Sequence, residues 1–108
     1  MPTPADPIKS SLAQKLTTRA RTAWPQLAAV TVRHRGAFAY VEGQLASGEN
    51  LKLMRLRYIG SATVWGFALH LASTDTYEDT ILPTGGFAGT PEDALDCACG
   101  LYLAGPEL

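Results

Sequence analysis

Between residues 29 and 71 the chain alternates apolar and polar side chains along four short segments, with connections of hairpin length between them. A period of two is typical of strands that bury one face. The segments are Ala29–Arg35, Ala37–Leu45, Leu51–Ile59 and Ala62–Leu71, and a fifth short strand is predicted at Tyr77–Leu82. Short connections favour simple order, so the pattern predicts an antiparallel meander of four or five strands.

The strand register is testable, because a slip of one residue moves every side chain to the other face of the sheet. With turns at Arg35-Gly36, Ser47–Asn50 and Gly60-Ser61, all three hairpins agree on one division of the faces. The core face then holds Val30, Val32, Ala39, Val41, Met54, Leu56, Tyr58, Trp65, Phe67 and Leu69. The open face holds Thr31, Arg33, Phe38, Tyr40, Glu42, Arg55, Arg57, Val64, Gly66, Ala68 and His70.

These registers predict specific neighbours across the sheet: Arg33 opposite Phe38, Glu42 opposite Arg55, and Leu56 opposite Trp65. Two residues break the alternation, because Lys52 falls on the core face and Leu53 on the open face.

A helix is predicted on either side of the strands. Asp6-Pro7 provides an N-cap acceptor followed by proline at the first helical position, and Pro25 ends the apolar stripe after Trp24. Thr90-Pro91 opens the second helix in the same way. Both helices need an apolar partner, so we expect an α+β two-layer sandwich with both helices packed on the core face.

Composition places the chain among globular proteins. With 108 residues, 46% of them hydrophobic, it makes one domain over 1–108, with residues 1–6 as a disordered tail. No apolar run approaches the ~20 residues that cross a bilayer, and no secretory signal opens the sequence, so the expected compartment is the cytoplasm. Cys97 and Cys99 point about 200° apart on a helix, which favours reduced, buried thiols. No metal and no cofactor are predicted.

Charge divides the chain into two halves. All nine Lys and Arg residues lie between Lys9 and Arg57, whereas seven of the ten acidic residues follow Gly60. The net charge of −1 therefore hides a polarised molecule. Part of this polarity would be satisfied internally if the basic first helix and the acidic second helix lay side by side.

The open face is the candidate binding surface, because it combines arginines with large aromatic side chains. The proposed interface residues are Arg33, Phe38, Tyr40, Arg55, Arg57 and His70. Three interpretations stay open: a second copy or another protein packs there; single-stranded nucleic acid stacks on the aromatic rings; or the arginine stems cover the rings and nothing binds. We favour a protein partner, with homodimerisation as its first form.

Nucleic acid is the less favoured partner. The order helix–strands–helix resembles a double-stranded-RNA-binding domain, which carries basic residues at the start of its second helix. Here that position holds Glu92, Asp93 and Asp96. A small enzyme or a metal-binding protein that uses the acidic segment Asp75–Asp79 is a further alternative, but nothing in its spacing forces groups into acid–base contact, and catalysis is not favoured.

The second half of the chain resembles a family of small actinobacterial proteins of the Streptomyces type, whose function is unknown. The resemblance is carried by Leu53–Tyr58, Trp65–Ala68, Tyr77–Asp79, Gly89–Asp96 and Gly100–Leu103. It implies an origin and carries over no functional residue.

Overall fold

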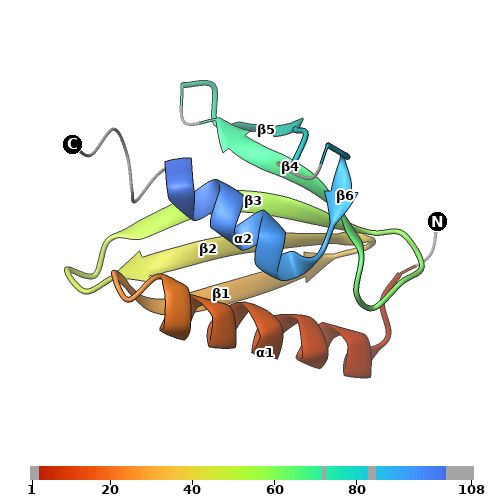
Figure 1. Cartoon of the computed structure of the whole chain (residues 1–108), viewed down its shortest axis with the longest axis horizontal. Helices are drawn as coiled ribbons and strands as arrows, with labels where there is room; N and C mark the ends of the chain where they lie inside the picture. The colour runs from red at the N-terminus through yellow and green to blue at the C-terminus, as the bar shows by residue number, and fades with distance from the viewer. Residues whose placement is uncertain (1–2, 72, 83–84, 102–108) are drawn as a thin grey trace.

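Five antiparallel strands form the sheet in the order β1-β2-β3-β4-β5, as the sequence predicts (Figure 1). The structure, a computed structural model, describes residues 3–71, 73–82 and 85–101. The strands are β1 (Leu27–Arg35), β2 (Phe38–Leu45), β3 (Asn50–Tyr58), β4 (Trp65–Leu71) and β5 (Thr76–Asp79). Residues 1 and 2 of the expected tail lie outside the described part.

Both helices cover the same face of this sheet, so the predicted α+β two-layer fold is confirmed (Figure 1). Helix α1 (Asp6–Ala23) packs against β1, and α2 (Pro91–Cys99) packs against β3 and β4. The two helices also pack against each other. No helix in the described ranges is long and apolar enough to cross a lipid bilayer.

The two helices begin differently from each other. The Thr90 side chain accepts a hydrogen bond from the Asp93 backbone N–H at 3.1 Å, which confirms Thr90 as the N-cap of α2. The prediction for α1 was wrong by one residue: Ala5 is the N-cap and makes no side-chain cap bond. Asp6 is instead the first helical residue, where its carboxylate still lies at the positive end of the helix dipole.

The core fills the space between the helices and the sheet. Trp65, Leu56, Met54 and Val41 contribute fully buried side chains from the sheet. The helices supply the other side of the core with Leu12, Leu16, Ala20, Ala94, Leu95, Ala98 and Cys99. All of the predicted core-face residues belong to this cluster or pack against it.

The predicted registers were wrong by two residues in the first and third hairpins, and in the second by two up to the bulge in β3 and by three beyond it. Arg33 lies opposite Tyr40, Glu42 opposite Lys52, and Leu56 opposite Phe67. The first turn uses Gly36 and Ala37, the second connection (46–49) begins one residue earlier than predicted, and the third (59–64) is longer than predicted. A slip of two leaves each side chain on its face, so the division between core face and open face survives.

Lys52 and Leu53 break the alternation because β3 contains a bulge. The register with β2 shifts between Val41 and Glu42, which pair with Met54 and Lys52, so Leu53 has no direct partner. Leu53 and Met54 are both completely buried as a result, and Lys52 returns to the open face.

A short strand, β6 (Ala88–Gly89), forms where the sequence predicted only a loop. It pairs with Trp65 and Gly66 at the start of β4, whereas β5 pairs with the end of the same strand. Residues 83 and 84 of that predicted loop lie outside the described ranges.

Candidate interaction surface

Arg55 is stacked between aromatic rings at the centre of the open face. Its guanidinium carbon lies 4.5 Å from the ring centroid of Phe38 and 5.7 Å from that of Tyr77. Tyr40 meets Tyr77 edge-on, with 5.3 Å between the ring centroids. Cations at such distances are attracted to the ring faces. We call Phe38, Tyr40, Arg55 and Tyr77 the aromatic–arginine cluster.

His70 supports this cluster from below. Its ring centroid lies 5.2 Å from that of Tyr77, and the residue is only 7% exposed. His70 Nε2 lies 2.8 Å from Asp75 Oδ1, and Lys52 Nζ donates to the same oxygen at 3.0 Å. The hydrogen bond with His70, followed by that with Lys52, lowers the pKa of Asp75. His70 therefore supports Tyr77 from inside the surface and has little exposed area for contact with a partner.

Several cations of the open face have no anionic neighbour. Arg33 lies 3.6 Å from Glu42, in place of the predicted pairing of Glu42 with Arg55. Across the described residues, no carboxylate lies within ion-pair distance of Arg35, Arg55 or Arg57. The excess positive charge of this face is thus left to solvent or to a partner.

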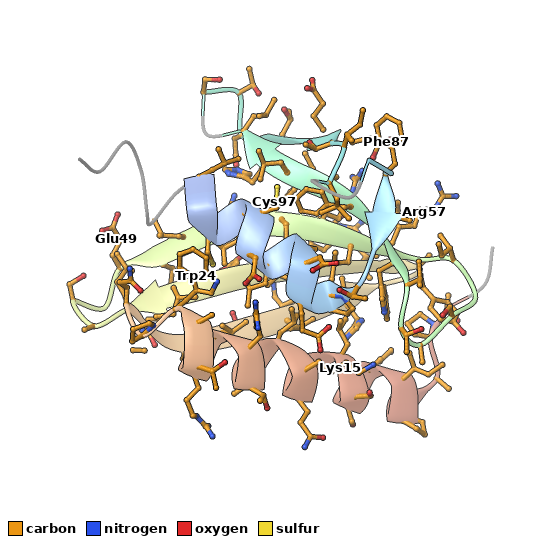
Figure 2. All side chains as sticks on the ribbon, in the orientation of Figure 1. Lys15, Trp24, Glu49, Arg57, Phe87 and Cys97 are labelled. Carbon is orange, nitrogen blue, oxygen red and sulfur yellow. The ribbon has the colours of Figure 1, made fainter. Side chains whose placement is uncertain are left out.

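The surface is hollowed on both sides of the aromatic–arginine cluster. The first hollow, of about 270 Å³, is floored by Gly66 and Ala68 on β4 and lined by two arginines, one carboxylate and three large apolar side chains: Arg55, Arg57, Asp79, Phe38, Ile59 and Phe87. We call it the Arg57 hollow. Ile59 and Phe87 are large apolar side chains that remain 49% and 57% exposed. Figure 2 shows Arg57 and Phe87 at the same end of the sheet.

The second hollow, of about 380 Å³, lies toward β1 and is strongly basic. It is lined by Arg33, Arg35, Lys52, Tyr40 and Tyr77, together with His34. We call it the Arg35 hollow. Burial raises the pKa of the Tyr77 hydroxyl, which therefore stays protonated and able to donate a hydrogen bond.

Some of the charge polarity is satisfied inside the molecule, where the helices lie side by side. Arg19 on α1 donates from Nε and Nη2 to the carboxylate of Asp96 on α2, with an Nε–Oδ1 distance of 3.1 Å. Trp24 Nε1 donates to the same carboxylate at 2.9 Å. These bonds, that of Arg19 first, lower the pKa of Asp96. The Arg19–Asp96 pair thus neutralises one charge of each helix, whereas Arg35, Arg55 and Arg57 on the open face have no such partner among the described residues.

His34 faces the helix layer at the end of β1. Its Nδ1 is buried and has no hydrogen-bond partner among the described residues. Burial, and then the positive charge of Lys9, lower its pKa. The neutral imidazole is therefore the stable form in this position.

The described residues offer few features of a catalytic or metal site. Within them, no group of three His, Cys, Asp or Glu side chains could hold a metal ion. Both cysteines are free, and burial raises the pKa of the Cys99 thiol to about 12, so this thiol is a poor nucleophile. Asp75 is held by His70 and Lys52 and does not converge with Glu78 or Asp79 on a common partner.

Comparison with known proteins found no matching family model, no matching curated protein and no matching solved structure. The resemblance to small actinobacterial proteins therefore stays a prediction.

The structure brings most of the predicted interface residues together on one surface. Phe38, Tyr40 and Arg55 form its centre, Arg57 flanks it, and Arg33 lies at its edge on β1. Sequence reasoning missed Tyr77, Lys52, Ile59 and Phe87. Alternation along β5 would have found Tyr77, which lies directly opposite His70. No sequence pattern predicts that Phe87 lies on the open face, because the long-range pairing of β6 with β4 places it there.

Proposed function

We propose that this chain is a small cytoplasmic protein that binds a protein partner through the open face of its sheet. The observation that carries the proposal is the combination of unpaired arginines with exposed apolar side chains around the Arg57 hollow. Arg and aromatic residues are favoured at protein interfaces, and a concave surface of this kind suits an apolar anchor.

The charge of this face favours an acidic partner over a second copy of the chain. A two-fold contact places the same patch against itself. Arg33, Arg35, Arg55 and Arg57 of one copy would then meet the same residues of the other copy, and like charges brought together oppose association. An acidic segment with one large apolar side chain would instead match both the arginines and the Arg57 hollow.

The test uses fluorescent ten-residue peptides in which acidic residues alternate with leucine or phenylalanine, compared with peptides that carry lysine in place of the acids. We expect the acidic peptides to bind more tightly by at least tenfold, and the R55Q/R57Q variant to lose most of that difference. The K15Q/R21Q variant of α1, which changes the net charge by the same amount, is the matched control and should bind as the parent does. Equal binding of acidic and basic peptides would contradict the proposal.

Size-exclusion chromatography with light scattering distinguishes the other partners. A dimer that the Tyr40→Glu substitution dissociates would show that a second copy occupies the open face. Salt-sensitive binding to a single-stranded oligonucleotide, weakened in R55A/R57A, would show that nucleic acid is the partner. Either result would replace the proposal of an acidic protein partner.

A further inference from the structure

β1 leaves one side of its backbone without a partner in the sheet. The Tyr58 backbone N–H donates to the Ala37 carbonyl at 2.7 Å, which fixes the alternation of hydrogen bonds along β2. Phe38, Tyr40 and Glu42 consequently direct their backbone groups toward β1, where they pair with Arg35, Arg33 and Thr31. The backbone N–H and C=O groups of Val30, Val32 and His34 must therefore point away from the sheet.

These outward groups are left to water. No hydrogen bond from a described backbone or side-chain group reaches them. β1 is nine residues long and contains no proline, no lysine and no glycine. The opposite edge is protected in the usual manner, because β5 has four residues and ends with two carboxylates, Glu78 and Asp79. An unprotected long edge is a template for an additional strand.

Antiparallel pairing of β1 with β1 of a second copy of this chain is disfavoured. Helix α1 packs over β1, and paired strands lie about 4.8 Å apart. Pairing β1 with its own copy would bring the two α1 helices to roughly that distance, whereas packed helices need about 8–10 Å. An extended segment that carries no helix layer of its own beside the edge meets no such obstacle.

We propose that an extended acidic segment of a partner protein adds to the sheet as an antiparallel strand beside β1. Its residues opposite Val30, Val32 and His34 would form the hydrogen-bonded pairs and turn their side chains toward α1, where Val30 and Val32 are half-exposed apolar neighbours. Its alternate residues would lie opposite Thr31, Arg33 and Arg35, on the open face.

Charge selects acidic residues at these alternate positions. The Arg33 side chain is 74% exposed, and Arg35 has no carboxylate partner in the described chain. Opposite charges directly across two strands stabilise the pair. The segment therefore alternates apolar and acidic side chains. The inference rests on the proposed function in one respect, that the partner is acidic, and it adds the backbone pairing that holds the partner.

The test uses a capped seven-residue peptide of alternating valine and glutamate, followed by amide exchange measured by nuclear magnetic resonance. At saturating peptide, the amides of Val30, Val32 and His34 should exchange at least tenfold more slowly. The amides of Thr31, Arg33 and Arg35, already bonded to β2, should not change. A peptide with lysine in place of glutamate should bind at least tenfold more weakly. Unchanged exchange at the three outward amides would overturn the inference.

Methylation of the peptide backbone tests the pairing without altering the protein. Methyl groups on the valine nitrogens remove the donors that face β1 and should abolish binding. Methyl groups on the glutamate nitrogens, which point outward, should leave it intact. Equal binding of the two methylated peptides would contradict strand addition.

Two protein variants separate this inference from the proposed function. Val32→Pro removes an outward N–H and should abolish peptide protection in a protein that keeps its circular dichroism spectrum. R55Q/R57Q should weaken the binding of acidic peptides that anchor in the Arg57 hollow. The same variant should leave the slowed amide exchange of β1 unchanged. Protection of β1 with no effect of R55Q/R57Q would leave strand addition standing and defeat the proposed use of the Arg57 hollow. The reverse pattern would defeat strand addition alone.

Discussion

Gly43 shows how a single residue accommodates the bulge in β3. A Cβ atom at this position would lie 2.7 Å from Leu27 Cδ2 and 3.2 Å from Leu53 Cδ1. The absence of a side chain at Gly43 thus leaves room chiefly for Leu27 and also for Leu53, the bulged residue. We predict that Gly43→Ala lowers the free energy of unfolding by about 1–3 kcal/mol in urea denaturation, because these leucines must shift. Gly100→Ala is the control: a Cβ there meets nothing within 4 Å, and φ is −59°, so stability should be unchanged or rise by up to ~1 kcal/mol.

His34 should make the fold sensitive to mild acid. Its pKa in the folded protein is lowered by burial and by Lys9, whereas the unfolded chain titrates near 6.5. The unfolded state therefore binds more protons below that value, and stability should fall as the pH drops from 6.5 through the folded pKa. We predict that the melting temperature of the parent protein falls more steeply between pH 7 and pH 5 than that of His34→Gln. Parallel melting curves of the two proteins would contradict this prediction.

Asp96 on α2 bonds Arg19 and Trp24 at the other helix, so its loss should destabilise the packing of α1 against α2. Asp96→Asn keeps an acceptor for Trp24 but loses the charged pair with Arg19, which should lower the free energy of unfolding at pH 7 by up to about 1 kcal/mol, because the pair is partly exposed to solvent. Because the pKa of Asp96 is lowered in the folded state, this contribution is present above the unfolded pKa and disappears as the pH falls through the folded one. Glu92→Gln removes the same charge from α2 and makes a matched control, with an expected change below about 0.5 kcal/mol.

The β4–β5 hairpin depends on Asp75. This residue has φ of 52°, and its carboxylate receives His70 and Lys52 together. We predict that Asp75→Ala increases the exchange rate of the β5 amides by about tenfold, since both bonds are lost and alanine is disfavoured at this φ. Asp75→Gly relieves the backbone strain but not the loss of the bonds, so it should lie between alanine and the parent. Equal exchange in all three proteins would show that the contacts of Asp75 do not hold the hairpin.

At the level of elements, the sequence predicts which residues share a face far better than which residues are neighbours. Face membership depends only on the parity of the strand position, and it survived register errors of two residues in every hairpin except at the bulge in β3, where Lys52 and Leu53 changed faces. Neighbours depend on where each turn closes, and Gly36, with φ of 60°, suits several positions in a turn. The sequence shows a break in the alternation at Leu53. Only the pairing of β3 with β2 identifies that break as a bulge.

The candidate site was predictable to the extent that it comes from local alternation. Arg33, Phe38, Tyr40, Arg55 and Arg57 all lie on the predicted surface. The burial of His70 was not predictable, because it results from Tyr77 on β5 and from Asp75 in the turn that precedes β5. The Arg57 hollow was not predictable either, because its wall at Phe87 is placed by long-range pairing and not by a repeating pattern.

For the molecule as a whole, net charge and effective surface charge should differ. The sequence carries a net charge of −1 and an isoelectric point near 6.0, which alone would predict binding to an anion exchanger at pH 7. The ion pairs Asp96–Arg19, Glu42–Arg33 and Asp75–Lys52 do not change this total, because each cancels one acidic and one basic group. The distribution of charge decides instead: Arg35, Arg55 and Arg57, unpaired among the described residues, lie together on the open face, where a cluster of one sign raises the local concentration of counter-ions.

We therefore predict that the protein is retained on a cation exchanger at pH 7 and low salt, oriented with its open face toward the resin. R35Q/R57Q should elute at a clearly lower salt concentration than the parent. K15Q/R21Q, which reaches the same net charge of −3 through substitutions on α1, should elute close to the parent, because those charges lie on the helix layer. Identical elution of the two variants would show that net charge alone decides retention. Identical elution would also remove the electrostatic argument for an acidic partner, because the resin is an anionic surface and should be attracted by the open face in the same way.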